Sequence, residues 1–313
     1  MPYPIEKKLV VGVSSNALFD LQEEDRIFHE EGLEAFKKHQ NENRNIVLKK
    51  GPAYPFIRRF LNINDIFPDK QPVEVVILSK NSPETGLRIF KSIEKYKLNI
   101  TRAAFTSGRS PFEYIPAYNI SLFLSTDATD VKNAIGKNYP AGRILNTDVQ
   151  DNENDLELRI AFDFDGVLAD DSAEQFYQEC QNINEYYAHE SKNSNTPLEA
   201  GLLLTFLQKI SFFQKLENKA LQDNPEYKKV LRTAIITARN APAHERAVNT
   251  LRHWNVDVDE MFFLGGIDKR RILEILKPHL FIDDQVNHLD KSLIDIPLVH
   301  IPFGCINVEG DTK

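Results

Sequence analysis

Two carboxylates follow an apolar run near the middle of the chain, in the segment Arg159-Ile160-Ala161-Phe162-Asp163-Phe164-Asp165-Gly166-Val167-Leu168. Residues at i and i+2 share one face of a strand, so Asp163 and Asp165 are expected to converge on one ligand. The carboxyl ends of strands are where open α/β sheets bind ligands. There Asp163 can attack phosphorus as a nucleophile while Asp165 exchanges a proton with the leaving group. An isolated pair of this kind is more often a solvated turn, so the interpretation depends on the segments downstream.

Three later apolar segments also end in polar residues. The first ends in Thr237, whose hydroxyl can hold a phosphate oxygen, and the second leads through two glycines to Lys269, which can neutralise negative charge. The third ends in Asp283-Asp284. Carboxylates beside Asp163 favour Mg²⁺, because this ion takes oxygen ligands and bridges carboxylates to substrate phosphate. The sequence leaves open which of the two adjacent aspartates is the direct ligand.

This order of motifs resembles the haloacid dehalogenase-like superfamily of aspartyl-phosphate hydrolases over residues 158–302. A narrower resemblance, to the cytosolic 5′-nucleotidase I family, spans nearly the whole chain. It is carried by Val11-Gly12-Val13-Ser14-Ser15-Asn16-Ala17-Leu18-Phe19, Thr106-Ser107-Gly108-Arg109-Ser110-Pro111, Leu122-Phe123-Leu124-Ser125-Thr126-Asp127 and Phe281-Ile282-Asp283-Asp284-Gln285. The resemblance implies Mg²⁺-dependent hydrolysis of nucleoside 5′-monophosphates.

The predicted site combines these motifs with their immediate neighbours. The catalytic residues are predicted to be Asp163, Asp165, Thr237 and Lys269. The substrate-binding residues are predicted to be Thr237, Ala238, Arg239, Lys269 and Gly166. The metal ligands are predicted to be Asp163, Asp165, Asp284 and Asp283.

Composition indicates a globular protein. Of 313 residues, 42% are hydrophobic and 27% charged, and the formal net charge of −8 argues against a nucleic-acid polymer as the main partner. Two cysteines, Cys180 and Cys305, are too few for a disulfide framework, which favours a reducing cytoplasm. We expect no membrane span, because no unbroken apolar run is long enough. The sequence leaves open whether the protein forms a homo-oligomer.

Strand-like runs alternate with helical ones, which predicts an α/β fold built on parallel sheet. The candidate strands are Lys8–Val13, Val73–Leu78, Ala103–Thr106, Ile120–Leu124, Leu158–Phe162, Thr233–Ile236, Met261–Leu264, Leu280–Ile282 and Leu298–Ile301. They divide into two halves, since Phe105 and Gly108 recur 158 positions later as Phe263 and Gly266. We predict two Rossmann-like halves from a tandem duplication, residues 1–148 and 149–313, with the boundary in the polar stretch 146–155.

The two halves differ in chemistry. Aligning Leu18-Phe19-Asp20 with Leu168-Ala169-Asp170 pairs Val13 with Asp163, Ser15 with Asp165 and Ser125-Thr126 with Asp283-Asp284. The first half thus lacks a nucleophile and most of a metal site. We interpret it as a structural half, and the alternative is that Ser14, Ser15, Asn16 and the Thr106–Arg109 turn contribute to a nucleotide pocket.

The second half carries an insert, about 171–232, with helical patterns over Ser172–Tyr187 and Leu198–Asn218. The superfamily resemblance implies a helical cap here, which closes over the site and reads the leaving group. Its aromatic residues offer a face for a nucleobase, although aromatics at helical spacing are more often core. These residues are Phe176, Tyr177, Tyr186, Tyr187, Phe206, Phe212 and Phe213.

The predicted function is therefore that of a cytoplasmic 5′-nucleotidase with a nucleoside monophosphate as substrate. Two alternatives remain. The first is a phosphatase for another small ester such as a sugar phosphate, because the insert that selects the substrate is the least legible region. The second is a non-catalytic nucleotide sensor, which the intact set of polar residues in the second half argues against.

Overall fold

The computed structural model describes residues 3–145, 151–289, 292 and 296–307. The chain divides into two compact units, Met1–Asp151 and Asn152–Lys313. The predicted boundary at residue 148 falls outside the described residues. Among the described residues, each unit contributes five strands that pair in parallel with their neighbours in the unit, so the α/β fold class is confirmed. In the described part of the chain, no helix has the length and apolar character needed to cross a membrane.

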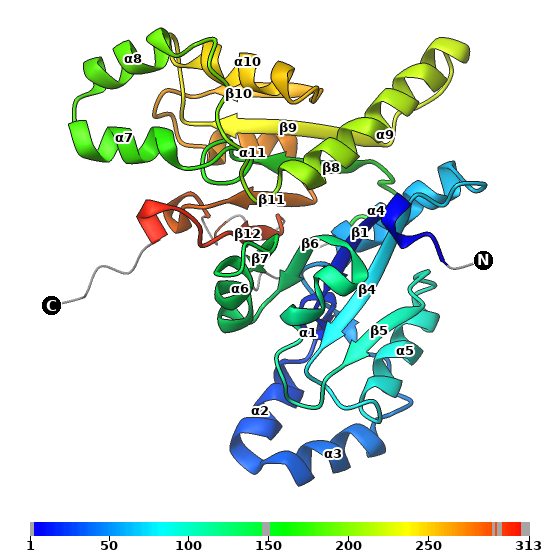
Figure 1. Cartoon of the computed structure of the whole chain (residues 1–313). Helices are drawn as coiled ribbons and strands as arrows, with labels where there is room; N and C mark the ends of the chain where they lie inside the picture. Colours follow the sequence, from blue (N-terminus) through cyan, green and yellow to red (C-terminus); the bar gives the residue numbers. More distant parts are fainter. Residues whose placement is uncertain (1–2, 146–150, 290–291, 293–295, 308–313) are drawn as a thin grey trace, which may run out of the picture. The chain divides into compact units, whose positions relative to one another are not determined.

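The first unit has the strand order β7-β6-β1-β4-β5, with every neighbouring pair parallel (Figure 1). Its strands are β1 (Leu9–Val13), β4 (Val73–Ser79), β5 (Arg102–Phe105), β6 (Ile120–Ser125) and β7 (Ala141–Ile144). All residues of β1, β4 and β6 are buried. Such continuous apolar runs are typical of parallel strands covered on both faces.

The described part of the first unit also contains the helices α1–α6 and an antiparallel ribbon. The helices are α1 (Ser15–Leu18), α2 (Gln22–Glu31), α3 (Leu33–Glu42), α4 (Tyr54–Ile66), α5 (Gly86–Lys95) and α6 (Ala128–Ile135), with short 3₁₀ turns η1 (Ile5–Lys7), η2 (Phe112–Tyr114) and η3 (Pro116–Tyr118). The ribbon pairs β2 (Phe19–Asp20) with β3 (Lys49–Lys50) and brackets α2 and α3. Helix α6 begins where the Asp127 carboxylate accepts the backbone N–H groups of Thr129 and Asp130.

The second unit has the parallel strand order β10-β9-β8-β11-β12. Its strands are β8 (Leu158–Phe162), β9 (Leu231–Thr237), β10 (Glu260–Phe263), β11 (Leu280–Asp283) and β12 (Leu298–His300). Its helices are α7 (Ser172–Cys180), α8 (Ile183–Lys192), α9 (Leu204–Asp223), α10 (His244–His253) and α11 (Arg270–Leu276), with 3₁₀ turns η4 (Val286–His288) and η5 (Cys305–Asn307).

The two units repeat one topology, and matching backbone bonds fix the residue correspondence. Ser14 donates its N–H to the carbonyl of Leu124 at 2.8 Å, and Asp163 donates to Ile282 at 2.8 Å. Leu124 and Ile282 are 158 positions apart, the offset seen in the sequence. Ser14 is therefore the counterpart of Asp163, and the sequence alignment that paired Asp163 with Val13 was wrong by one residue.

The discrepancy arises from one additional residue in the second unit's turn. Beyond that turn the offset is 150, as the alignment assumed, because Gly51 donates to Leu18 at 2.9 Å and Gly201 donates to Leu168 at 2.8 Å. Both glycines lie against the turn so closely that a Cβ would come within 2.7 Å and 2.5 Å of backbone oxygens. A pattern that counts identical letters cannot place an insertion inside a short turn.

A two-helix excursion occurs in both units, whereas the sequence predicted it only for the second. Helices α2 and α3 leave through the β2–β3 ribbon, and α7 and α8 leave through an antiparallel bridge between Ala169 and Ala200. Figure 1 shows each pair extending from the carboxyl end of its own sheet. The predicted helix 198–218 is instead α9, which packs against β9. The helical excursion therefore ends well before residue 232.

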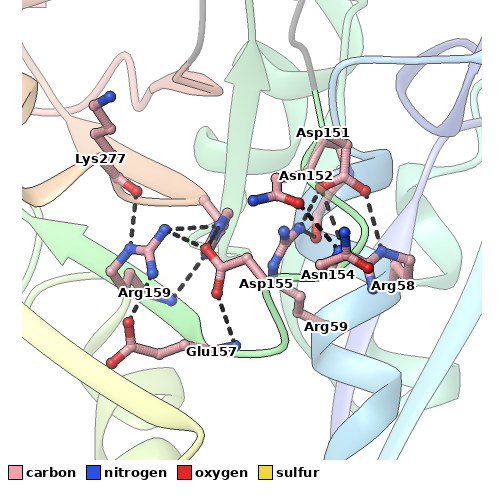
Figure 2. A network of polar contacts seen from close by, with 11 residues as sticks. Arg58, Arg59, Asp151, Asn152, Asn154, Asp155, Glu157, Arg159 and Lys277 are labelled. Carbon is pink, nitrogen blue, oxygen red and sulfur yellow. Dashed lines mark hydrogen bonds and ion pairs between the residues drawn. The ribbon is translucent and has the colours of Figure 1, made fainter.

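Each end of the segment that links the units is tied to its own unit (Figure 2). Asp151 accepts from Arg59 at 2.6 Å and from Arg58 at 3.1 Å, both on α4. Burial by itself raises the pKa of Asp151, but the two guanidinium groups hold it below its usual value. On the other side, Arg159 of β8 donates to Asp155 at 2.7 Å.

Candidate active site

Asp163 follows β8 at the carboxyl edge of the second unit's sheet and is only 5% exposed. One carboxylate oxygen accepts the N–H of Phe164 at 2.7 Å, and the other lies 2.8 Å from Nζ of Lys269. Burial raises the pKa of Asp163 to about 7, with Asp283 and Asp165 acting in the same direction and Lys269 opposing them. A second cation, in addition to Lys269, would therefore favour the ionised, nucleophilic form of Asp163.

Lys269 connects the two strand ends that carry the aspartates. Its ammonium is 2.8 Å from Asp163 and 2.7 Å from Asp283, and the residue is 3% exposed. Burial by itself lowers the pKa of Lys269, but the two carboxylates raise it well above its usual value. Lys269 therefore places a buried positive charge beside the proposed nucleophile.

The adjacent aspartates at the end of β11 have opposite environments. Asp283 accepts from Lys269, from the backbone N–H of Gln285 at 2.8 Å and lies 3.2 Å from Nδ1 of His288. Although burial raises it, these partners hold the pKa of Asp283 below its usual value. Asp284, by contrast, has a buried Oδ1 with no partner among the described residues. Burial, then Asp163 and Asp283, raise its pKa to about 9.

A cation fits this arrangement at Asp284. Asp163, Asp283 and Asp284 are all buried and repel one another electrostatically, and a buried carboxylate oxygen without a partner among the described residues needs a ligand. Asp163, Asp283 and His288 also have ligand atoms within 4.8 Å of one another. In that trio, however, Oδ2 of Asp163 and Oδ2 of Asp283 are already bound by the Lys269 ammonium.

Gly166 makes room for Asp284. Its φ is +72°, in the left-handed region that favours glycine, and a Cβ there would lie 2.5 Å from Oδ2 of Asp284. Thr237 ends β9, and its hydroxyl accepts the N–H of Arg239 at 3.1 Å. The carbonyl of Ala238 accepts the N–H of Gly265 at 3.1 Å. The predicted substrate-binding residues thus lie at the ends of strands or in the segments that follow them, at the carboxyl edge.

Asp165 is held by Arg239 through two hydrogen bonds of 2.8 and 2.7 Å. The same guanidinium donates to Glu190 of α8, which is fully buried and also accepts from Arg246 at 2.7 Å. Burial lowers the pKa of Arg239, but Asp165 and its other partners raise it above the usual value. Arg239, predicted as a substrate ligand, instead links the proposed acid/base residue to the helical excursion.

Glu190 and Arg246 were not predicted from the sequence, although a signal exists. His189-Glu190 and Asn193 repeat His39-Gln40 and Asn43 at the offset of 150. Both asparagines donate to the histidine carbonyl four residues earlier at 2.9 Å. That repeat would have shown that α3 and α8 correspond.

The predicted aromatic residues of the insert separate into two groups. Phe206 and Phe213 are 0% and 5% exposed, which places them in the core of the second unit. Phe176 stacks on His189 with ring centroids 3.9 Å apart, and Tyr177 contacts Tyr186 at 5.8 Å, all on α7 and α8. Only the second group lies on the helical excursion.

Comparison with known proteins assigns the family. The family model described as 5′-nucleotidase matches residues 1–308. The chain belongs to the 5′-nucleotidase family. This confirms the family resemblance found in the motifs.

Within this family, cytosolic 5′-nucleotidase 1B of Homo sapiens is 31% identical over 299 residues, which are 93% of this chain and 48% of the relative. The chain thus spans about half the length of that curated relative. No solved structure matches the chain.

Proposed function

We propose that this protein hydrolyses nucleoside 5′-monophosphates to nucleoside and phosphate. Family membership over residues 1–308 supports the substrate class. The observation that carries the chemistry is the buried cluster in which Lys269 contacts Asp163 and Asp283 while Asp284 keeps an unpartnered oxygen. A metal-dependent phosphatase requires such a cluster, and a simple binding module does not.

Asp163 is the proposed nucleophile. In the first step one of its oxygens forms a bond to phosphorus, the bond from phosphorus to the 5′-oxygen breaks, and the departing oxygen takes a proton from Asp165. In the second step Asp165 removes a proton from water, which attacks phosphorus and releases the Asp163 carboxylate. Lys269 and Thr237 stabilise the phosphoryl oxygens in both steps.

Mg²⁺ is the proposed cofactor, and when bound it supplies positive charge to the phosphoryl oxygens and lowers the pKa of Asp163. Asp163, Asp165 and Asp284 are the proposed ligands. Asp283 is proposed to position Lys269 rather than bind the ion, because Lys269, His288 and a backbone N–H already use its oxygens.

In this structure, Arg239 donates two hydrogen bonds to Asp165, the proposed acid/base residue. Because the Arg239 guanidinium binds both carboxylate oxygens of Asp165, neither oxygen is placed to exchange a proton with a leaving group. We propose that Asp165 leaves Arg239 when substrate binds, with Arg239 retained by Glu190. Helices α7 and α8 would then act as the cap that the sequence predicted, because Glu190 lies on α8.

Phosphate release from a panel of ribo- and deoxyribonucleoside 5′-monophosphates and sugar phosphates, with Mg²⁺ and with chelator, tests this function. We expect release only from nucleotides and only with Mg²⁺. Faster release from sugar phosphates would favour the other phosphatase, and nucleotide binding without any release would favour the sensor.

The two free cysteines, Cys180 and Cys305, support the proposed reducing cytoplasmic location.

A further inference from the structure

The first unit contains a cavity of about 970 Å³ at the carboxyl ends of β1, β4 and β6. Ser14, Ser79 and Ser125 line it, and each is the last residue of its strand or the next one along. In the repeated topology this is the position of the acidic cluster around Asp163 in the second unit. Cavities of this size commonly bind small molecules.

Hydroxyl groups replace carboxylates in this cavity. Ser14 stands for Asp163, as the matching backbone bonds show, and Ser125-Thr126 stand for the adjacent aspartates of β11. The Ser14 hydroxyl oxygen accepts the N–H of Ala17 at 3.2 Å, and that of Ser125 accepts the N–H of Asp127 at 3.1 Å. Each hydroxyl can still donate its own proton. The cavity therefore offers hydrogen bonds without a nucleophile or a metal-binding cluster.

Asn81 supplies a second, independent sign of a ligand. It lines the cavity at the position of Arg239, and its Nδ2 is buried with no acceptor among the described residues. Buried amide donors are nearly always paired in folded proteins. A ligand oxygen or ring nitrogen in the cavity would satisfy it.

The charges around the cavity oppose a phosphate. Lys80 donates to Asp127 at 2.6 Å and lies 3.0 Å from Asp130, so its charge is already compensated. The other charged groups of the wall are the side chains of Asp25, Lys37 and Glu84, which leaves carboxylates in excess. Carboxylates repel a phosphate dianion but accept hydrogen bonds from ribose hydroxyls.

We propose that this cavity is a metal-free binding site for a nucleoside, with the ribose hydroxyls at the carboxylates and the base against Phe36, Pro83 and Pro111. The choice of a nucleoside rests on the proposed function, because a nucleoside is the uncharged product of the second unit's reaction. The carboxylate excess makes the site select the product over the phosphorylated substrate.

Calorimetric titration of the full chain with adenosine, in chelator, tests the proposal. Thr126→Phe fills the cavity, and Asn81→Ala removes the unpaired amide while preserving the backbone. We expect adenosine affinity to fall at least about tenfold in the first variant and about fivefold in the second. Glu113→Gln, an exposed carboxylate of the same unit outside the cavity, is the matched control and should bind as the wild type does.

Adenosine 5′-monophosphate and free ribose form the comparison arms. The binding that Thr126→Phe abolishes should have a lower affinity for the monophosphate than for adenosine. In Asp127→Asn, the ratio of these two affinities should fall about tenfold. Unchanged adenosine binding in both cavity variants, tighter binding of the monophosphate, or equal binding of ribose would each overturn the proposal. Phosphate release by Thr126→Phe is measured in parallel, so failure of the proposed function is seen separately.

Discussion

The two units share a topology, yet their carboxyl edges have opposite chemistry. The second unit collects Asp163, Asp283 and Asp284 around one buried lysine. The first unit has Ser14 and Ser125-Thr126 at the same positions, and its lysine, Lys80, is half exposed. The comparison indicates that the shared topology alone confers no chemistry. A few side chains at the strand ends decide whether an edge holds a reactive anion cluster or a cavity lined by hydroxyl groups.

The largest expected difference between the units concerns the nucleophile. Asp163→Asn should lower kcat for nucleotide hydrolysis at least about 10³-fold, because the amide cannot attack phosphorus. Ser14→Ala, at the matching position, should leave kcat within about twofold, since no step uses that residue. Phosphate release measures both variants. Equal losses of kcat in the two variants would refute this difference between the units. Beryllofluoride, which mimics a phosphoryl group on an aspartate, should bind at one site per chain, and two sites would refute it as well.

The second largest expected difference concerns how much Lys269 and Lys80 contribute to the free energy of unfolding. Lys269→Met leaves two buried carboxylates without their cation, and should lower the free energy of unfolding by about 3 kcal/mol. Lys80→Met should cost about 1 kcal/mol or less, because the Lys80 pair is half exposed and screened by solvent. Urea unfolding of both variants measures the difference. A larger loss of unfolding free energy in Lys80→Met would show that Asp163 and Asp283 remain stably buried without the charge of Lys269.

Asp284 should make the metal-free protein less stable as pH rises. Its folded pKa is about 9, against 3.8 for an unperturbed aspartate. Between these values the folded state keeps a proton that the unfolded state releases, so rising pH favours unfolding. Asp284→Asn should remove this slope above about pH 7, where Asp163, with its pKa of about 7, no longer contributes, and should add about 1 to 2 kcal/mol at pH 7 in chelator.

Denaturant titrations from pH 5 to 9 check the slope, and added Mg²⁺ should suppress it in the wild type. Thr126→Asn, at the matching position of the first unit, serves as control and should leave the slope unchanged. A slope that persists above about pH 7 in Asp284→Asn would assign it to a group other than Asp284.

The smallest effect should be equal in the two units. Asn43→Ala and Asn193→Ala each remove a hydrogen bond of 2.9 Å to a helix carbonyl. Each should lower the free energy of unfolding by about 0.5 to 1 kcal/mol. Thermal or urea unfolding of the pair gives the comparison. Unequal losses would show that the excursions α2–α3 and α7–α8 have diverged in packing as well as in chemistry.

Local sequence predicted much of the fold. Every predicted strand is present, because buried parallel strands appear as short apolar runs that need no knowledge of their partners. Strand β7 was missed, since Ala141–Ile144 is short and contains a glycine and an exposed Arg143. The ribbon β2–β3 was missed for a similar reason, with two residues on each side.

The residue types of the site also came from the sequence, because a carboxylate pair, a threonine and a lysine at strand ends are visible as letters. Their contacts did not. The position of Lys269 between Asp163 and Asp283, the hold of Arg239 on Asp165, and the contrast between Asp283 and Asp284 depend on which strand ends are neighbours. Strand order and side-chain direction are set by packing between segments distant in the chain, and one extra residue in a turn was enough to move Ser14, rather than Val13, to the position of the nucleophile.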